Sequence, residues 1–238
     1  MKKIKVQFVC PPEEKIQFKD SKALITVSLG NKTQQAEKLS ATLKKAIETF
    51  GHVDLLVGDT LQSHNLQWIN GFRPPEARSR AYVLGSEWIE ANLHRLPSEL
   101  QPNRLLRWND ILACKYFDDL YNSVTDKYTS CRTFRKHVAD SAKYFAFGKL
   151  PTTPLSNAHL DYIIYASINY ILEECAGFQV LAKMGYDYEI YPSKRLDAVE
   201  YNYNVDDFAY NFISNTVVAL THLVHNFTDT LTDIENFI

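Results

Sequence analysis

Hydrophobic and polar positions follow two different periods in the first quarter of the chain. Residues 23–27 and 53–57 are short apolar runs that predict buried strands. Between them, residues 34–50 place apolar side chains three and four positions apart, which predicts an amphipathic helix. The polar segment 28–31 predicts the turn that joins the first strand to this helix. A strand, a helix and a strand within about 35 residues form a βαβ unit, which predicts parallel strands.

Helical periodicity dominates the rest of the chain. Paired prolines open the range 74–96, which is typical of a helix start, and the pattern predicts a helix there. Further helices are predicted over 108–122, 131–147, 159–175 and 206–225. Residues 188–191 predict one more strand. No internal repeat or linker divides the sequence, so the pattern favours one α/β domain over residues 1–238, with a mostly parallel central sheet flanked by helices.

Composition is that of a globular protein. Hydrophobic residues make up 45% and charged residues 23% of the 238 positions, so the chain can bury a core without metal or disulfides. The sequence has no run of about 18 apolar residues to span a membrane, and the apolar run at 6–10 is too short for a signal peptide. No CxxC pair occurs, which predicts free thiols in a reducing cytoplasm. The four cysteines are Cys10, Cys114, Cys131 and Cys175.

The net charge of -2 is unevenly distributed. Residues 196–238 contain seven acidic residues and no Lys or Arg. The range 127–149 is the most basic, and its only acidic residue is Asp140. Its basic residues are Lys127, Arg132, Arg135, Lys136, Lys143 and Lys149. Such a range can contact the phosphates of a nucleic acid or form the solvated face of a helix, and charge alone favours the solvated face.

Ser28 directly follows the first predicted strand. Open α/β sheets bind ligands at the carboxyl ends of their strands, where a hydroxyl can act as a nucleophile. A serine in this place can also cap the next helix, and its position alone favours the cap. The surrounding residues do not form a G-x-S-x-G nucleophile elbow, and residues 30–33 lack the first glycine of a phosphate-binding loop.

Two other pairs carry potential chemistry. Tyr170 and Glu174 are four apart, which puts them on one face of the predicted helix 159–175. A carboxylate beside a phenol can bind an ammonium group and shuttle protons, whereas spacing alone favours a surface glutamate next to a packed tyrosine. His222 and His225 share a predicted helix face without a recognisable third ligand, so packing or surface roles are favoured over a metal site.

Several of these pieces occur together in the order and spacing of one family. The sequence resembles the tRNA-dependent cyclodipeptide synthases over about residues 20–225. The matching pieces are Thr26-Val27-Ser28-Leu29-Gly30-Asn31, Val57-Gly58-Asp59, Gly71 to Arg78 (G-F-R-P-P-E-A-R), Tyr170-Ile171-Leu172-Glu173-Glu174, and Tyr191-Pro192. The resemblance implies a single Rossmann-like domain similar to the catalytic domain of class I aminoacyl-tRNA synthetases. It also implies no ATP chemistry and no cofactor, because the substrates arrive as activated tRNA esters.

The resemblance implies a role for each matching residue. Ser28 falls at the nucleophile that accepts the first aminoacyl group. Tyr170 and Glu174 fall at the pair that holds the α-ammonium of that group, and Glu174 also helps the second amine to lose its proton. A second aminoacyl-tRNA then reacts to leave a dipeptidyl ester on Ser28. Tyr191 relays a proton as the free amine closes the cyclic dipeptide, a 2,5-diketopiperazine, and Asn31 supports the catalytic loop.

The sequence departs from the family pattern at three places. Asn31 fits one subfamily and Pro192 fits the other, so the subfamily stays open. Thr26 stands where many members carry glycine, beside the first aminoacyl pocket. The helix over 74–96 is richly basic in many members, whereas its basic residues are balanced here by acidic ones.

The implied partners are two aminoacyl-tRNAs, with no metal and no membrane. Within the helix 74–96, Arg78 and Arg80 are expected to make most of the contact with the first tRNA, and the basic range 127–149 is the alternative. Which two amino acids are joined, and the oligomeric state, stay open. Two other hypotheses also stay open, a Rossmann-like nucleotide-binding protein and an inactive tRNA-binding module. The first lacks a phosphate loop, and the intact residue set at the site disfavours the second.

Overall fold

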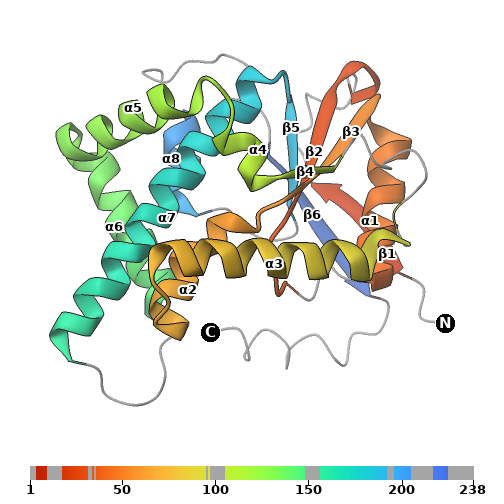
Figure 1. Ribbon diagram of the computed structural model, residues 1–238. Helices are drawn as coiled ribbons and strands as arrows, with labels where there is room; N and C mark the ends of the chain where they lie inside the picture. Colours follow the sequence, from red (N-terminus) through yellow and green to blue (C-terminus); the bar gives the residue numbers. More distant parts are fainter. Residues whose placement is uncertain are drawn as a thin grey trace.

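The described residues of the computed structural model form a six-stranded sheet with helices on both faces (Figure 1). The structure describes residues 4–9, 18–31, 34, 36–94, 96, 105–147, 156–191, 196–204 and 217–224. The strands are β1 (Ile4–Val9), β2 (Lys22–Val27), β3 (His52–Val57), β4 (Leu105–Arg107), β5 (Tyr188–Tyr191) and β6 (Val217–Val224). The helices are η2 (Phe18–Asp20), α1 (Ala36–Thr49), η4 (Thr60–Gln62), α2 (Ser63–Asn70), α3 (Pro74–Leu93), α4 (Trp108–Leu112), α5 (Phe117–Ser130), α6 (Arg132–Phe147), α7 (Asn157–Lys183) and α8 (Asp197–Asn204).

The sheet has the strand order β1-β6-β5-β2-β3-β4. Neighbouring strands from β6 to β4 are parallel, and β1 is antiparallel to β6. In register, Val27 of β2 lies opposite Val57 of β3, and Val57 lies opposite Arg107 of β4. The carboxyl ends of β2, β3, β4 and β5 therefore meet at one edge, which faces α2 and α3 in Figure 1. The predicted mostly parallel sheet is confirmed.

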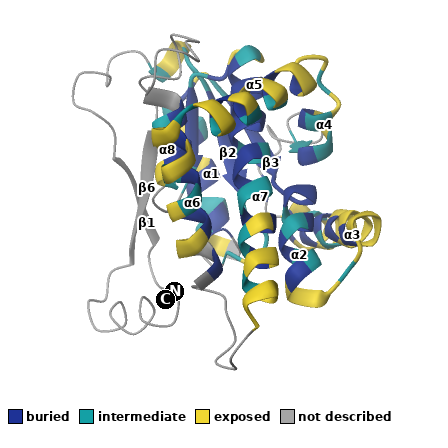
Figure 2. Cartoon of the chain, turned by 90° about the vertical axis from the view of Figure 1, so that its left-hand side faces the viewer, coloured by how far each residue is buried: buried dark blue, intermediate teal, exposed yellow. Residues whose placement is uncertain are grey.

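Alternating side chains of the central strands pack into two separate cores. Ala23, Ile25 and Val27 lie in one core with α1, while Leu24 lies in the other core with α5, α6 and α7. β3 follows the same alternation, and Tyr188 and Ile190 of β5 belong to the α1 side. Figure 2 shows β2 and β3 as buried strands in the interior of the molecule. It follows that Thr26 of β2 and Tyr191 of β5 point toward the α7 side of the sheet.

The longest helix, α7, contributes much of the core on its side of the sheet. Ser156 caps its amino terminus, where the serine side chain accepts a hydrogen bond from the backbone N–H of His159. The predicted helix 159–175 is therefore right in type but too short, because α7 continues to Lys183. Most of the extra residues, 176–182, are buried, so packing against the sheet extends the helix.

Two predicted helices are wrong in part. The range 108–122 is not one helix, because residues 113–116 separate α4 from α5. The predicted helix 206–225 contains β6, which lies between β5 and β1 in the sheet. Valine and threonine in this segment favour a strand. Pairing with β5 and β1 stabilises that strand, although the spacing of apolar residues is also compatible with a helix. Residues 205–216 lie outside the described residues.

Three smaller predictions concern histidines, thiols and membrane spans. His222 lies on β6 opposite Val6, so it does not share a helix face with His225, which lies outside the described residues. Cys114, Cys131 and Cys175 are free thiols, as predicted, whereas Cys10 is not among the described residues. Within the described part of the chain, no helix combines the length and apolar character needed to cross a membrane.

Candidate active site

Polar residues gather where the parallel strands end. Ser28 follows β2, Asp59 follows β3, Trp108 follows β4 and Tyr191 is the last residue of β5. Ligands of open α/β sheets bind at this edge. The edge therefore joins Ser28 and Tyr191, which lie far apart in the sequence, in one region of the molecule.

The loop that carries Ser28 is held by the buried side chain of Gln34. The backbone N–H of Ser28 donates to Oε1 of Gln34 at 2.8 Å, and Nε2 of Gln34 donates to the carbonyl of Thr26. The N–H of Asn31 donates to the carbonyl of Ser28 at 3.2 Å. Gly30 has a φ of +88°, which favours glycine in this turn. These contacts fix the backbone on both sides of Val27 and keep Ser28 half-buried at the edge of the sheet.

The helix-cap alternative for Ser28 is wrong. The helix after it, α1, begins only at Ala36, too far along the chain for Ser28 to occupy its cap position. Asn31 lies in the turn after Ser28, and its backbone N–H closes that turn.

Tyr170 and Glu174 lie on one face of α7, as their spacing predicts. The hydroxyl of Tyr170 donates to Oε1 of Glu174 at 3.5 Å, at the limit of a hydrogen bond, and Nε2 of Gln62 donates to the same hydroxyl at 3.4 Å. Burial raises the pKa of Tyr170 well above 10, and the nearby Glu174 and Tyr191 raise this pKa further. The phenol is therefore protonated at neutral pH and can donate a hydrogen bond. The effect of Tyr191 on this pKa fits its place at the end of β5, on the α7 side of the sheet.

A second carboxylate, Glu173, lies in a hydrogen-bonded chain beside this pair. Nε1 of Trp108 donates to its Oε1 at 2.7 Å, and Nε2 of His64 lies 2.8 Å from its Oε2. The ring of His64 stands edge-on to the ring of Tyr170, with centroids 6.4 Å apart. α2, α4 and α7 thus meet at a polar cluster that the sequence pattern did not predict. The only signal in the sequence is the adjacent Glu-Glu pair, which does not tell which glutamate contacts which neighbour.

Gly177 allows Trp108 to reach this cluster. A Cβ atom on Gly177 would lie 2.6 Å from Cζ2 of Trp108 and closer still to Cη2, far nearer than real Cβ contacts. Trp108 is fully buried and also packs edge-on against Phe178. The close contact between the indole and the backbone of α7 fixes the position along α7 at which the indole N–H donates to Glu173.

A buried ion pair forms a second cluster at the same edge. Asp59, which is fully buried, accepts from Nε of Arg107 at 2.6 Å and from the backbone N–H of Thr60 at 2.7 Å. The backbone N–H of Trp108 also donates to Oδ1 of Asp59, at 3.3 Å. The family-like Val57-Gly58-Asp59 piece therefore has a structural role that the sequence did not reveal.

Arg107 also holds α3 against the sheet edge. Its guanidinium donates to the carbonyl of Tyr82 at 2.6 Å and to Oγ of Ser86 at 3.0 Å, and it stacks over the Tyr82 ring at 3.5 Å. A Cβ atom on Gly85 would lie 2.5 Å from Cβ of Asp59. Glycine at this position lets α3 approach the ion pair closely.

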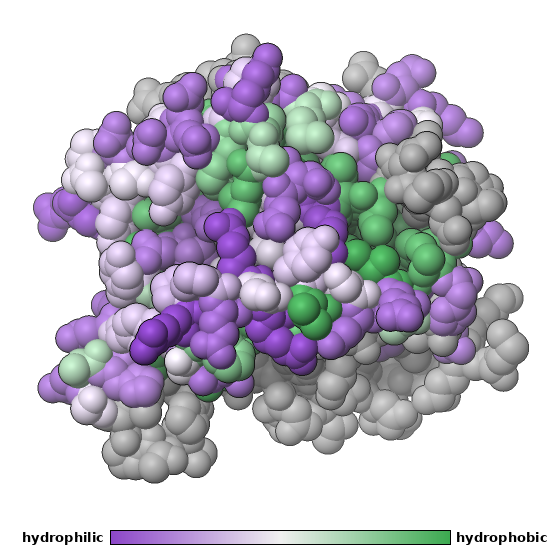
Figure 3. Space-filling view, viewed as in Figure 1, coloured by the Kyte–Doolittle hydropathy of each residue, from purple (hydrophilic) through white to green (hydrophobic). Residues whose placement is uncertain are grey.

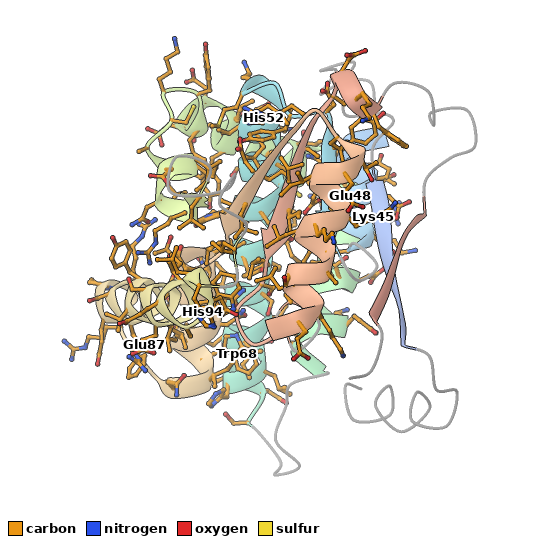
Figure 4. All side chains as sticks on the ribbon, turned by 90° about the vertical axis from the view of Figure 1, so that its right-hand side faces the viewer. Lys45, Glu48, His52, Trp68, Glu87 and His94 are labelled. Atoms are coloured by element: carbon orange, nitrogen blue, oxygen red, sulfur yellow. The ribbon has the colours of Figure 1, made fainter. Side chains whose placement is uncertain are left out.

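The two arginines predicted to contact tRNA lie on the exposed surface of α3. Arg78 and Arg80 are both exposed, and Nη1 of Arg80 donates to Oε1 of Glu87 at 3.2 Å. Hydrophilic side chains predominate over α3 in the space-filling view, and greener side chains appear above it (Figure 3). Figure 4 places Glu87 on this helix beside the lower end of the sheet. The helix thus presents its charged side chains next to the carboxyl edge.

The described basic residues of the range 127–149 divide between one buried lysine and the exposed surface of α6. Lys127 is buried, with Nζ 5.2 Å from the centroid of the Phe134 ring and 5.5 Å from that of Tyr201. The other described basic residues lie on α6, and Lys149 lies outside the described residues. These α6 residues are Arg132, Arg135, Lys136 and Lys143. The exposed residues of α6 fit both a solvated helix face and a contact with tRNA phosphates, whereas Lys127 is buried.

Solved structures share this architecture. A CDPS from Fluoribacter dumoffii is similar with a TM-score of 0.83 and 24% sequence identity, over 93% of this chain and 99% of that one. CDPS stands for cyclodipeptide synthase. The chain has the cyclodipeptide synthase fold. The predicted Rossmann-like fold is thereby confirmed.

Two other structures with the cyclodipeptide synthase fold are more distant. A cyclodipeptide synthase from Candidatus Glomeribacter gigasporarum, bound to Phe-tRNAPhe, has a TM-score of 0.63 and 18% identity, over 90% of this chain and 92% of that one. A Mycobacterium tuberculosis protein, described as demonstrating that cyclodipeptide synthetases are related to type I tRNA synthetases, has a TM-score of 0.65 and 16% identity, over 92% and 93%. No family model and no curated protein matches the sequence.

Proposed function

We propose that the protein is a cyclodipeptide synthase, which takes aminoacyl groups from two aminoacyl-tRNAs and joins them into a cyclic dipeptide. The observation that carries the proposal is a sheet with the cyclodipeptide synthase fold whose carboxyl edge carries a serine loop and a strand-end tyrosine, with a Tyr–Glu pair on the helix that covers this side of the sheet. The residues in question are Ser28, Tyr170, Glu174 and Tyr191.

In the first step, Oγ of Ser28 attacks the ester carbon of an aminoacyl-tRNA. The bond from that carbon to the ribose oxygen breaks, and the aminoacyl group becomes an ester of Ser28. The Gln34 bridge supports this role, because it fixes the backbone of Ser28 without using the serine hydroxyl. Thr26, which points to the same side of the sheet, forms part of the wall around the first aminoacyl group.

The Tyr170–Glu174 pair binds the α-ammonium of this aminoacyl group. Glu174 supplies the negative charge, and Tyr170 supplies a polar oxygen that accepts from the ammonium while its own hydrogen points to Glu174. The raised pKa of Tyr170 supports this assignment, because a protonated phenol orients an amine without competing for its proton. The two oxygens lie 3.5 Å apart on one face of α7, so one ammonium group beside them can donate to both.

The second half of the reaction forms two amide bonds. The amine of the acyl-enzyme attacks the ester carbon of a second aminoacyl-tRNA, and Glu174 helps this amine to lose its proton. The free amine of the resulting dipeptidyl ester then attacks the ester carbon on Ser28. Tyr191 relays a proton in that step, the ring closes and Ser28 is regenerated. Holding the two acyl groups together makes ring closure effectively intramolecular.

The first tRNA contacts α3 through Arg78 and Arg80. Both side chains are exposed on a helix that Arg107 fastens to the carboxyl edge, so a phosphate backbone bound there lies near Ser28. A structure of the same fold that is bound to Phe-tRNAPhe supports the choice of an aminoacyl-tRNA as substrate.

Product analysis tests the proposal. The protein is incubated with total tRNA, the twenty amino acids and their synthetases, and cyclic dipeptides are identified by mass spectrometry. Wild-type protein should yield a cyclic dipeptide and Ser28→Ala should yield none. Ser21→Ala is a matched control, because Ser21 precedes the other end of β2, and it should retain the product. Retained tRNA binding with no product from any charged tRNA would overturn the proposal in favour of a binding module.

A further inference from the structure

The mechanism proposed above leaves one titratable pair at the site unused. Nε2 of His64 and Oε2 of Glu173 lie 2.8 Å apart, and the side chains are 17% and 14% exposed. α2 carries the histidine and α7 carries the glutamate. The pair therefore borders solvent, at the same face of α7 as Tyr170.

The hydrogen bonds assign the roles of the two imidazole nitrogens. An indole N–H can only donate, so Oε1 of Glu173 accepts from Trp108. With Oε2 as the remaining acceptor, His64 donates from Nε2, and its Nδ1 is the nitrogen that can take up or release a proton. Within the described part of the chain, Nδ1 of His64 makes no hydrogen bond. A carboxylate that orients an imidazole with one nitrogen left for the substrate is the arrangement of many acid–base catalysts.

His64 also lies beside the groups that would hold the amine. Its ring is edge-on to the Tyr170 ring, with 6.4 Å between centroids. Gln62, two positions earlier, donates to the Tyr170 hydroxyl at 3.4 Å. Among the described residues, His64 contacts Glu173 and Tyr170 of α7, and Glu173 acts in turn on Tyr121 of α5, whose pKa is raised first by burial and then by Glu173. The surroundings are thus negative or neutral, which suits a group that becomes a cation.

The reaction requires such a group. Before it can attack, the α-ammonium of the acyl-enzyme must lose a proton. Tyr170 is a protonated phenol, and a carboxylate such as Glu174 is intrinsically a weaker base than an imidazole. An imidazole next to the Tyr170–Glu174 pair is therefore better suited to accept the proton that Glu174 helps the amine to lose.

We infer that His64, held by Glu173 and Trp108, is a further catalytic residue, the base that takes the proton from the amine of the acyl-enzyme through its Nδ1. The inference rests on the proposed function. One ammonium proton moves to Nδ1, and the free amine attacks the ester carbon of the second aminoacyl-tRNA. The C–N bond forms and the bond between carbon and ribose oxygen breaks. The amide nitrogen loses a second proton as the ribose oxygen gains one, and the imidazolium returns its proton to solvent.

His64→Gln separates this role from a structural one. The glutamine amide can still donate to Glu173 from the place of Nε2, but it has no nitrogen that titrates. His52→Gln is the matched control, because Nε2 of His52 lies 2.9 Å from Oδ2 of Asp54 in a similar pair at the opposite end of the parallel strands. Figure 4 shows His52 at the end of the sheet away from Trp68 of α2.

Rapid-quench kinetics resolve the two steps. Acylation of Ser28 by the first aminoacyl-tRNA should change less than about twofold in His64→Gln, whereas consumption of the acyl-enzyme by the second should slow by about 100-fold. His52→Gln should match wild type in both steps. Adding imidazole to His64→Ala should restore part of the second step, which a purely structural residue would not allow.

The inference would be overturned if His64→Gln ran both steps at wild-type rates, or if it slowed both steps equally. It would also be overturned if His64→Ala were defective in the second step while His64→Gln was not. A wild-type protein that forms no acyl-enzyme would overturn the proposed function instead, so the two failures are distinguishable.

Discussion

The two ends of the parallel strands carry the same kinds of residue but hold them differently. At the amino end, Asp54 accepts from the hydroxyl of Tyr186 at 2.5 Å and lies 2.9 Å from Nε2 of His52. Nζ of Lys22 is 3.7 Å from the same carboxylate and 4.0 Å from the centre of the Tyr186 ring. At the carboxyl end, the corresponding Tyr170–Glu174 contact is 3.5 Å long.

The difference fits a structural cluster at the amino end and the proposed site at the carboxyl end. Asp54 makes short hydrogen bonds to Tyr186 and His52 and an ion pair with Lys22. Such a cluster stabilises the fold. Glu174 makes only a long contact with Tyr170, and its carboxylate can still accept from a cationic ligand beside the pair. Residue type alone therefore does not separate the two ends, and it is the position of Tyr170 and Glu174 at the carboxyl edge that favours ligand binding there.

Neutralising one carboxylate at each end should give two different defects, a loss of activity at the carboxyl end and a loss of stability at the amino end. Glu174→Gln removes the charge that binds the ammonium, so we expect kcat/KM for cyclic dipeptide formation to fall by about 1,000-fold. Asp54→Asn should cost about 3 kcal/mol of unfolding free energy, because it leaves Lys22 and His52 without their carboxylate. Urea denaturation and steady-state kinetics measure both quantities. A large loss of activity in folded Asp54→Asn would contradict a purely structural role for the amino-end cluster.

A methyl group at Gly177 should disturb the carboxyl end through packing. Gly177→Ala places a Cβ atom 2.6 Å from Cζ2 of Trp108, so the indole must move and the unfolding free energy should fall by about 1–3 kcal/mol. Trp108→Phe in the same protein removes the atoms that clash and should recover part of this loss. If the two changes in unfolding free energy are strictly additive in a double-mutant cycle, the two residues are not in steric contact.

The two arginines of α3 should contribute unequally to tRNA binding. Removing one phosphate contact should lower the slope of log affinity against log salt concentration by about one. Arg78→Ala should show this full change, whereas Arg80→Ala should show less, because Arg80 is already paired with Glu87 at 3.2 Å. Glu87→Gln is the control and should tighten binding. Equal slopes for wild type and Arg78→Ala, measured by filter binding, would argue against α3 as the tRNA-binding surface.

The sequence was sufficient for the features that depend on nearby residues. The β2–α1–β3 unit, the start of α3 and the Tyr170–Glu174 face all follow from local spacing. β6 was missed because its strand character comes from pairing with β1 at the far end of the chain, where Val6 lies opposite His222. A local pattern cannot report such a partner.

The sequence predicts the family-like residues of the candidate site, whereas it does not predict the contacts that support them. His64, Trp108 and Glu173 come from three helices, and nothing in their own segments marks them as neighbours. The same holds for Asp59 and Arg107, whose ion pair joins the ends of two strands. These contacts exist only once the parallel strands are in register.

The smallest expected effect is on stability at alkaline pH. Burial, Glu174 and Tyr191 raise the pKa of Tyr170 in the folded state, whereas an unfolded tyrosine ionises near a pH of about 10. Below that pH neither state has lost the proton and the stability is fully present. As the pH rises above about 10, the unfolded state ionises first, so the unfolding free energy falls. Tyr170→Phe should weaken this fall, and the exposed control Tyr144→Phe should not. An unchanged alkaline denaturation curve for Tyr170→Phe would contradict the assignment.

The central claim is that Ser28 carries an aminoacyl group, and intact-protein mass spectrometry tests it most directly. The protein is mixed with one charged tRNA at a time, quenched within seconds in acid, weighed and digested. We expect a mass increase of one aminoacyl group with a cognate tRNA, located on the peptide that contains Ser28 and absent from Ser28→Ala. A cyclic dipeptide formed with no adduct on Ser28, or an adduct that persists in Ser28→Ala, would contradict the account.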